Sequence, residues 1–128
     1  PSIHQVLLDF INFAGNKILV AHNAAFDLAF LNIALGQLGK VRIVNPVIDT
    51  HVLAKSLMPN MTEYSLENLT ARFNIIMKGR HTALGDSLMT AKIFLSLLQK
   101  LEEKRIITLK QLSDFLSCEK KQSNIIGP

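Results

Sequence analysis

The sequence predicts an α/β domain that contains a pair of parallel strands. Helical and strand patterns alternate in the first half of the chain, which is typical of this fold class. Of the 128 residues, 48% are hydrophobic and 19% are charged, which is enough for the packed core of one domain. Two short strands are too few for a parallel sheet that is covered on both faces. We therefore expect an incomplete domain whose remaining strands come from an upstream segment or from another chain.

The first half of the chain holds both predicted strands. Ser2 is expected to cap a helix that ends near Gly15. Residues 17–21 are expected to form a buried strand, and Asn23 to cap a helix over residues 24–38. A little extended structure is expected at 41–44, and the second strand at 46–49.

The second half is predicted to be helical. A short helix is expected to run to Leu57, and Ser65 to begin the next helix, which ends near Phe73. A long helix over residues 82–104 follows, and then a helix from Thr108 to about Leu116 with a loose tail. The side chains expected on the buried side of the long helix are Leu84, Leu88, Ala91, Leu95 and Leu98.

Composition excludes several classes of protein. Cys118 is the only cysteine, so the chain has no internal disulfide and no cysteine-based zinc site, and we expect a cytoplasmic location. The formal net charge of +4 favours an anionic partner only mildly. The apolar stretch 18–39 contains His22 and Asp27 among other polar residues, so it is better explained by a strand and a core helix than by a membrane span.

Two of the five aspartates are candidates for chemistry. Asp9 and Asp114 lie among polar neighbours on helices, and Asp49 or Thr50 is expected to cap the short helix that follows. Asp27 lies in the first turns of a helix that directly follows a strand, which is where ligands bind in α/β sheets.

Asp86 lies early in the long helix, five residues after His81. Carboxylates suit Mg²⁺ or Mn²⁺, and a neutral histidine can take a proton from water, which together are the groups of metal-assisted phosphodiester hydrolysis. A helix-dipole role for Asp86 and a surface position for His81 remain equally open from the residues alone.

Two segments carry a resemblance to a known family. Residues 19–32, LVAHNAAFDLAFLN, closely resemble the second motif of the DnaQ-like, DEDDh-type 3′–5′ exonucleases, and residues 81–91 resemble the third, the H-x-x-x-x-D pattern. Residues 47–50 and 64–69 resemble the segments that connect these motifs. The resemblance covers residues 1–104 and is greatest to the proofreading exonucleases of bacterial DNA polymerase III type. It implies that 1–104 is the C-terminal part of an exonuclease domain and that 105–128 is an additional helix and tail.

The resemblance implies a ribonuclease H-like fold that removes nucleotides from single-stranded DNA 3′ ends with two divalent metals, Mg²⁺ or Mn²⁺. DNA polymerase is a possible partner. Asp27 and Asp86 would be metal ligands, and His81 would be the general base. The resemblance further implies that Asn23 and Phe26 lie near the substrate and that His22 and Thr90 support the site.

The chain departs from the family in one respect. The first motif, D-x-E, supplies the other two acidic ligands and occurs nowhere in this sequence. The first three strands of the fold are therefore expected to be missing, and the chain alone to be inactive or very weak. The alternatives are a non-catalytic module that binds nucleic acid or a polymerase, and a DEDDh ribonuclease, since the sequence does not reveal contacts to a 2′-OH.

Overall fold

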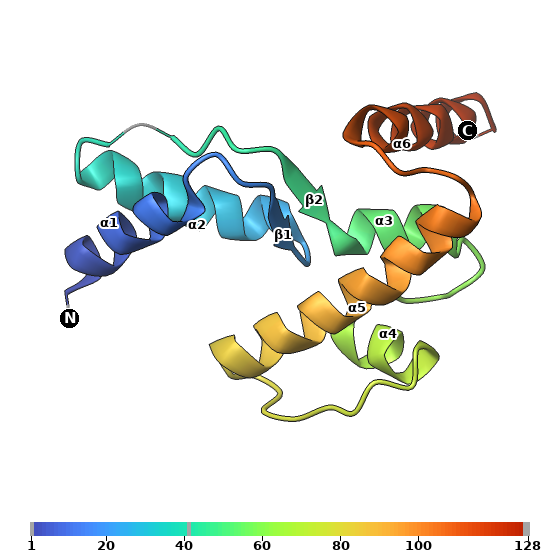
Figure 1. The fold of residues 1–128 in the computed structure, drawn as a ribbon, viewed down its shortest axis with the longest axis horizontal. Coiled ribbons are helices and arrows are strands. Elements are labelled where there is room, and N and C mark those ends of the chain that lie inside the picture. The colour runs from blue at the N-terminus through green and yellow to red at the C-terminus, as the bar shows by residue number, and fades with distance from the viewer. Residues whose placement is uncertain (1, 41, 127–128) are drawn as a thin grey trace. The chain divides into compact units, whose positions relative to one another are not determined.

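The computed structural model describes residues 2–40 and 42–126, with side chains described up to residue 118. The described residues form six helices and two strands (Figure 1). They divide into two compact units, one that ends at Asp49 and one that begins at Thr50. The predicted α/β class is confirmed, because both strands and the helix between them lie within the segments where the sequence places them.

The first unit is built around two parallel strands. Its elements are α1 (Ile3–Ala14), β1 (Leu19–Ala21), α2 (Ala24–Gln37) and β2 (Val47–Asp49). The strands pair in register, with Leu19 opposite Val47 and Ala21 opposite Asp49. Both strands are half-buried, whereas the first of them was predicted to be buried. The pairing brings the carboxyl ends of β1 and β2 together, and α2 begins just after this end of β1.

Helix α2 is apolar around most of its surface. Ala24 and Leu35 are buried against the rest of the unit, while Phe26, Phe30 and Ile33 form a stripe that is 81%, 65% and 64% exposed. Helices that are apolar all round normally lie inside a larger core. No helix in the described part of the chain has the length and apolarity to cross a membrane.

The second unit is a cluster of helices around α5. It contains α3 (Thr50–Leu57), α4 (Leu66–Arg72), α5 (Ala83–Glu103) and α6 (Leu109–Ile126), and α5 packs against both α3 and α4. Ser65, Thr82 and Thr108 cap α4, α5 and α6 through their hydroxyl oxygens, the first and third as predicted. The completely buried side chains Leu53, Leu69, Ile93 and Leu97 form its core.

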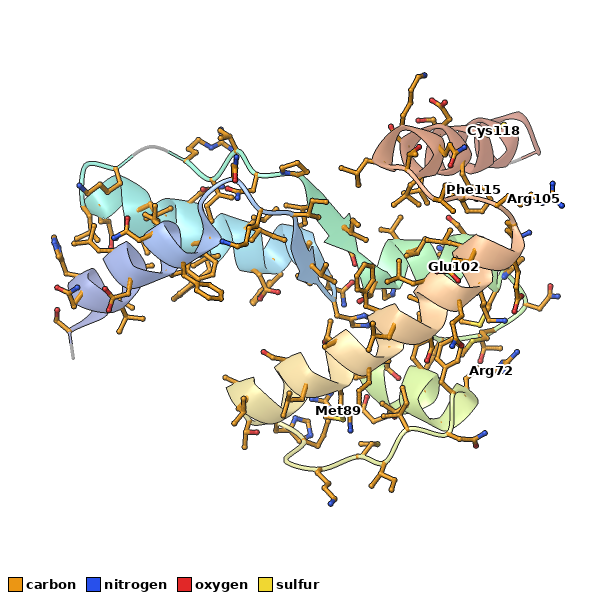
Figure 2. The ribbon with its side chains drawn as sticks, in the orientation of Figure 1. Arg72, Met89, Glu102, Arg105, Phe115 and Cys118 are labelled. Carbon is orange, nitrogen blue, oxygen red and sulfur yellow. The ribbon has the colours of Figure 1, made fainter. Side chains whose placement is uncertain are left out.

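The buried face of α5 differs from the predicted one. Leu84, Leu88 and Leu95 are 72%, 54% and 61% exposed. The buried residues are Gly85, Met89, Thr90, Ile93, Leu97 and Leu101. Figure 2 labels Met89 on this helix. The prediction failed because α5 carries apolar side chains on two faces. Helices α3 and α4 pack against α5, and the face that is buried contains Met89, Ile93 and Leu97 rather than the predicted leucines.

Two further predictions are wrong in detail. Helix α6 continues to Ile126, whereas a loose tail was predicted after Leu116. The reason is that the sequence has neither glycine nor proline between Leu116 and Gly127, and its Glu, Lys and Gln residues favour helix. Residues 42–44 form no strand, and residue 41, where extended structure was expected to begin, lies outside the described residues.

Candidate active site

Asp49 caps helix α2 from the end of the neighbouring strand. Its Oδ1 accepts a hydrogen bond from the Asn23 amide and its Oδ2 from the Ala24 amide, both at 3.0 Å. The predicted capping by the Asn23 side chain is wrong: Asn23 has left-handed backbone angles, φ 62° and ψ 56°, and makes no side-chain cap. The parallel pairing explains this, because it places the Asp49 carboxylate beside the positive end of α2.

An open pocket of about 570 Å³ lies at this end of the strand pair. The residues that line it are His22, Asn23, Ala25, Phe26, Asp27 and Asp49. Four predicted site residues are thus brought together. Asp27 is in the first turn of α2 and is exposed, so within this unit its carboxylate is open to solvent and to a cation.

A second set of predicted residues lies around the start of α5. One carboxylate oxygen of Asp86 accepts a hydrogen bond from the His81 amide at 3.1 Å. The hydroxyl of Thr90 donates to the Asp86 carbonyl at 2.8 Å, one turn further along the helix. His81 itself is exposed. The H-x-x-x-x-D segment therefore folds back on itself, so that the backbone of His81 contacts the Asp86 carboxylate.

The turn that carries His81 is unusually tight. His81 has a φ of 71° and Gly79 a φ of 67°, both in the left-handed region. A Cβ added to Gly85 would lie 2.0 Å from the Gly79 carbonyl oxygen. Left-handed backbone is costly for a residue other than glycine and persists only where the surroundings enforce it. The close contact between Gly79 and Gly85 supplies part of that constraint.

Arg80 links this turn to helix α4. Its Nε donates to Glu67 at 2.5 Å and its Nη1 donates to the second carboxylate oxygen of Asp86 at 2.8 Å. The hydrogen bond from Arg80 holds the pKa of Glu67 below its ordinary value of 4.5, and the same bond raises the pKa of Arg80. Both oxygens of Asp86 are thus held by neighbouring donors, which fixes the direction of this carboxylate.

The contacts of Asp49 with α2 and of Arg80 with Glu67 and Asp86 were not predicted from the sequence. Asp27 was identified because ligand-binding residues gather at the carboxyl ends of parallel strands. The same rule applies to Asp49, which lies at the end of β2. Arg80 directly precedes His81, but nothing in the local sequence points to its pairing with Glu67, thirteen residues earlier.

Two carboxylates have the chemistry to hold a metal. Oxygen donors such as Asp27 and Asp86 fit Mg²⁺ or Mn²⁺. Asp27 belongs to the first unit and Asp86 to the second. Among the described residues, no three His, Cys, Asp or Glu side chains come together as a metal-binding group. The donor type therefore fits a hard divalent ion, with one of the two candidate ligands in each unit.

Comparison with known proteins agrees with the motifs. A family model described as "Exonuclease" matches residues 1–94. The protein named DNA polymerase III PolC-type from Bacillus subtilis (strain 168) is 39% identical over 125 residues, 97% of this chain. The proteins of the same name from Clostridium perfringens (strain 13 / Type A) and Oceanobacillus iheyensis are 39% and 36% identical over 98% and 91% of this chain.

The matched part is a small share of each relative. The chain spans 8% of the length of each of these three proteins. The family model covers more than half of the chain, and its match contains both motif segments. The chain therefore belongs to the exonuclease family, and it is of the DnaQ-like type with a ribonuclease H-like fold that the two motifs predicted.

Proposed function

We propose that this chain provides part of a metal-dependent 3′–5′ exonuclease that acts on DNA 3′ ends during proofreading or repair. The local structure around His81 and Asp86 supports this most directly. The backbone amide of His81 donates to the Asp86 carboxylate, so the turn at Arg80–His81 holds the backbone of His81 next to this carboxylate. The relatives' name, DNA polymerase III PolC-type, supports a DNA polymerase as the partner.

Each predicted residue has a role in this proposal. Asp27 and Asp86 would hold two divalent metals, Mg²⁺ or Mn²⁺, which when bound stabilise negative charge on the phosphate that is cleaved. His81 is exposed at its turn and would take the proton of the attacking water. The Thr90 hydroxyl, bonded to the Asp86 carbonyl, supports the turn of α5 that carries Asp86.

The pocket beside Asp27 would receive the terminal nucleotide. Phe26 is 81% exposed on its rim, and an aromatic ring in that position can stack on a base. Asn23 would contact the substrate, and His22, which lines the same pocket, would support the site.

The 128 residues supply two of the four acidic ligands that the resemblance implies. Because no D-x-E occurs in the sequence, we expect the isolated chain to bind metal weakly and to hydrolyse DNA very slowly or not at all. An upstream segment or another chain with D-x-E on a strand would complete both the ligand set and the two-stranded sheet.

Metal binding and nuclease activity test the proposal together. Mn²⁺ affinity would be measured by electron paramagnetic resonance for the chain and for Asp27→Asn and Asp86→Asn, with Asp114→Asn as an exposed control. We expect each of the first two substitutions to weaken binding and the control to leave it unchanged. Affinity that neither substitution alters would contradict the metal-ligand roles and favour a non-catalytic binding module.

The nuclease assay uses 3′-labelled single-stranded DNA and RNA of one sequence. We expect little release of mononucleotides from the isolated chain. Release that is absent in Asp86→Ala would overturn the expected inactivity and confirm an exonuclease. Release from RNA but not from DNA would favour the ribonuclease alternative.

A further inference from the structure

We infer that Asp49 is a positioning residue for the exonuclease site, because it holds the turn that presents Asp27. This inference rests on the proposed role of Asp27 as a metal ligand. Asp49 lies at the end of β2, and its carboxylate spans the two backbone amides at the start of α2, 25 and 26 residues earlier in the chain. Asp27 is three residues beyond the second of these amides.

Both oxygens of the Asp49 carboxylate are used. Each accepts one amide hydrogen bond at 3.0 Å, and the pairing of Ala21 with Asp49 brings the end of β2 alongside the end of β1. Hydrogen bonds to a charged acceptor are roughly twice as strong as neutral ones, and the helix terminus favours a negative charge. An asparagine could accept only one of these bonds, and its NH₂ group would face the other N–H.

The turn before α2 needs this support. Asn23 is in the left-handed region, which asparagine tolerates better than most residues but still at a cost. Its own side chain makes no capping bond, so the carboxylate of Asp49 is the cap for the first amides of α2. Without it, the turn at Asn23 is free to relax, and the first turn of α2, which contains Asp27, loses its fixed direction.

The competing explanation is that Asp49 itself holds a metal, since it lines the same pocket as Asp27. The two roles predict different behaviour in the absence of metal. A positioning residue affects the amides of Asn23 and Ala24 in the metal-free protein, whereas the loss of a mere ligand leaves their protection unchanged.

The experiment compares Asp49→Asn with Asp9→Asn. Asp9 makes the matched control because it is exposed in the same unit, carries the same charge and accepts a hydrogen bond from Gln5 within its own helix. Amide hydrogen exchange would be followed residue by residue by NMR without metal, and Mn²⁺ affinity by electron paramagnetic resonance.

For Asp49→Asn we expect the Asn23 and Ala24 amides to exchange about tenfold faster, since a lost cap has that effect on local opening. We expect Mn²⁺ to bind about tenfold more weakly, as when a residue that orients a metal ligand is removed. Asp9→Asn should change neither quantity.

A second variant keeps the test decisive if Asp49→Asn folds poorly. Asn23→Gly, combined with Asp49→Asn, favours the left-handed turn through the backbone itself and should restore much of the protection and the Mn²⁺ affinity. The inference is overturned if Asp49→Asn binds Mn²⁺ as tightly as the parent chain. It is also overturned if the Mn²⁺ affinity falls while the Asn23 and Ala24 amides exchange at an unchanged rate and Asn23→Gly restores nothing. If Asp27→Asn leaves Mn²⁺ affinity unchanged, the proposed function fails, while the exchange data still decide whether Asp49 holds the turn.

Discussion

Arg80 places a single guanidinium between carboxylates from two helices. It bonds to Glu67 on α4 and to Asp86 on α5, and its side chain is only 25% exposed. A planar guanidinium with several fixed donors is suited to such a double contact, whereas a lysine is not. Arg80 therefore links the start of α5 to α4 and sets the charge around Asp86.

The Glu67 pair makes stability depend on pH. Because the hydrogen bond from Arg80 lowers the pKa of Glu67 in the folded chain, the pair stabilises the fold above about pH 4.5, and this contribution is lost as the pH falls through the lowered value. We expect the difference in melting temperature between the parent chain and Glu67→Gln to shrink as the pH falls below about 4.5. Thermal unfolding followed by circular dichroism measures it. A difference that stays constant with pH would contradict the pairing.

The left-handed backbone at His81 predicts a contrast between two substitutions. His81→Gly and His81→Ala both remove the imidazole, but only glycine adopts a φ of 71° without strain. We expect the glycine variant to be more stable by about 0.5–1 kcal/mol in free energy of unfolding, since relief of strain exceeds the added freedom of the unfolded chain. Urea denaturation of the two variants tests this, and equal midpoints would show that the turn is not strained.

At the scale of elements, the start of α5 depends on a glycine. Gly85→Ala would place a Cβ 2.0 Å from the Gly79 carbonyl oxygen, a backbone atom that cannot move without opening the turn. We expect a loss of about 1–3 kcal/mol in the free energy of unfolding. Gly36→Ala in α2 is the matched control, because nothing lies within 4 Å of its added Cβ.

The control should change stability in the opposite direction. Alanine in a helix is favoured over glycine by up to about 1 kcal/mol, so Gly36→Ala should raise the urea midpoint. If Gly85→Ala were as well tolerated as Gly36→Ala, the close contact between the turn and α5 would be refuted.

The elements that the sequence predicted well are those with strong local signals. Ser2, Ser65 and Thr108 cap the helices that they were predicted to begin. Such caps are predictable because the capping side chain and the amide that it accepts from are only three residues apart. The face of α5 could not be read in this way. Its apolar residues occupy two faces, and only the packing of α3 and α4 decides which one is buried.

The candidate site, like the helices, was predictable only where the signal is local in the sequence. The motif residues Asp27, His81 and Asp86 come from patterns within short segments, and the structure places His81 beside Asp86. Asp49 caps the start of α2 from 25 residues away, and Arg80 joins Asp86 to Glu67, which lies 13 residues before Arg80. Such pairings depend on strand register and helix packing, so they lie beyond any local pattern.

At the scale of the whole molecule, the second unit has the better-formed core. Leu53, Leu69, Ile93 and Leu97 are completely buried there, and three helices contribute them. In the first unit, only Leu7, Ala14, Ala24 and Leu35 are buried hydrophobic residues among those described. The hydrophobic stabilisation of the fold is therefore concentrated after Asp49.

This distribution predicts the outcome of truncation. A shortened protein of residues 50–126 should keep its helical signal and unfold cooperatively with urea, because its core lies within one unit. A peptide of residues 1–49 should have little stable structure, since a pair of three-residue strands and few buried side chains are insufficient. Circular dichroism of both tests this. A stable peptide 1–49, or an unfolded 50–126, would contradict it.

The bond between Asp49 and the start of α2 also orders events in time. Its donors and acceptor are separated by most of α2 and the segment that follows, so it can form only after β2 has returned to lie beside β1. Local helical turns close in far less time than such long-range contacts. The body of α2 should therefore form early and its first turn late, which makes the direction of Asp27 one of the last features of this unit to be settled during folding.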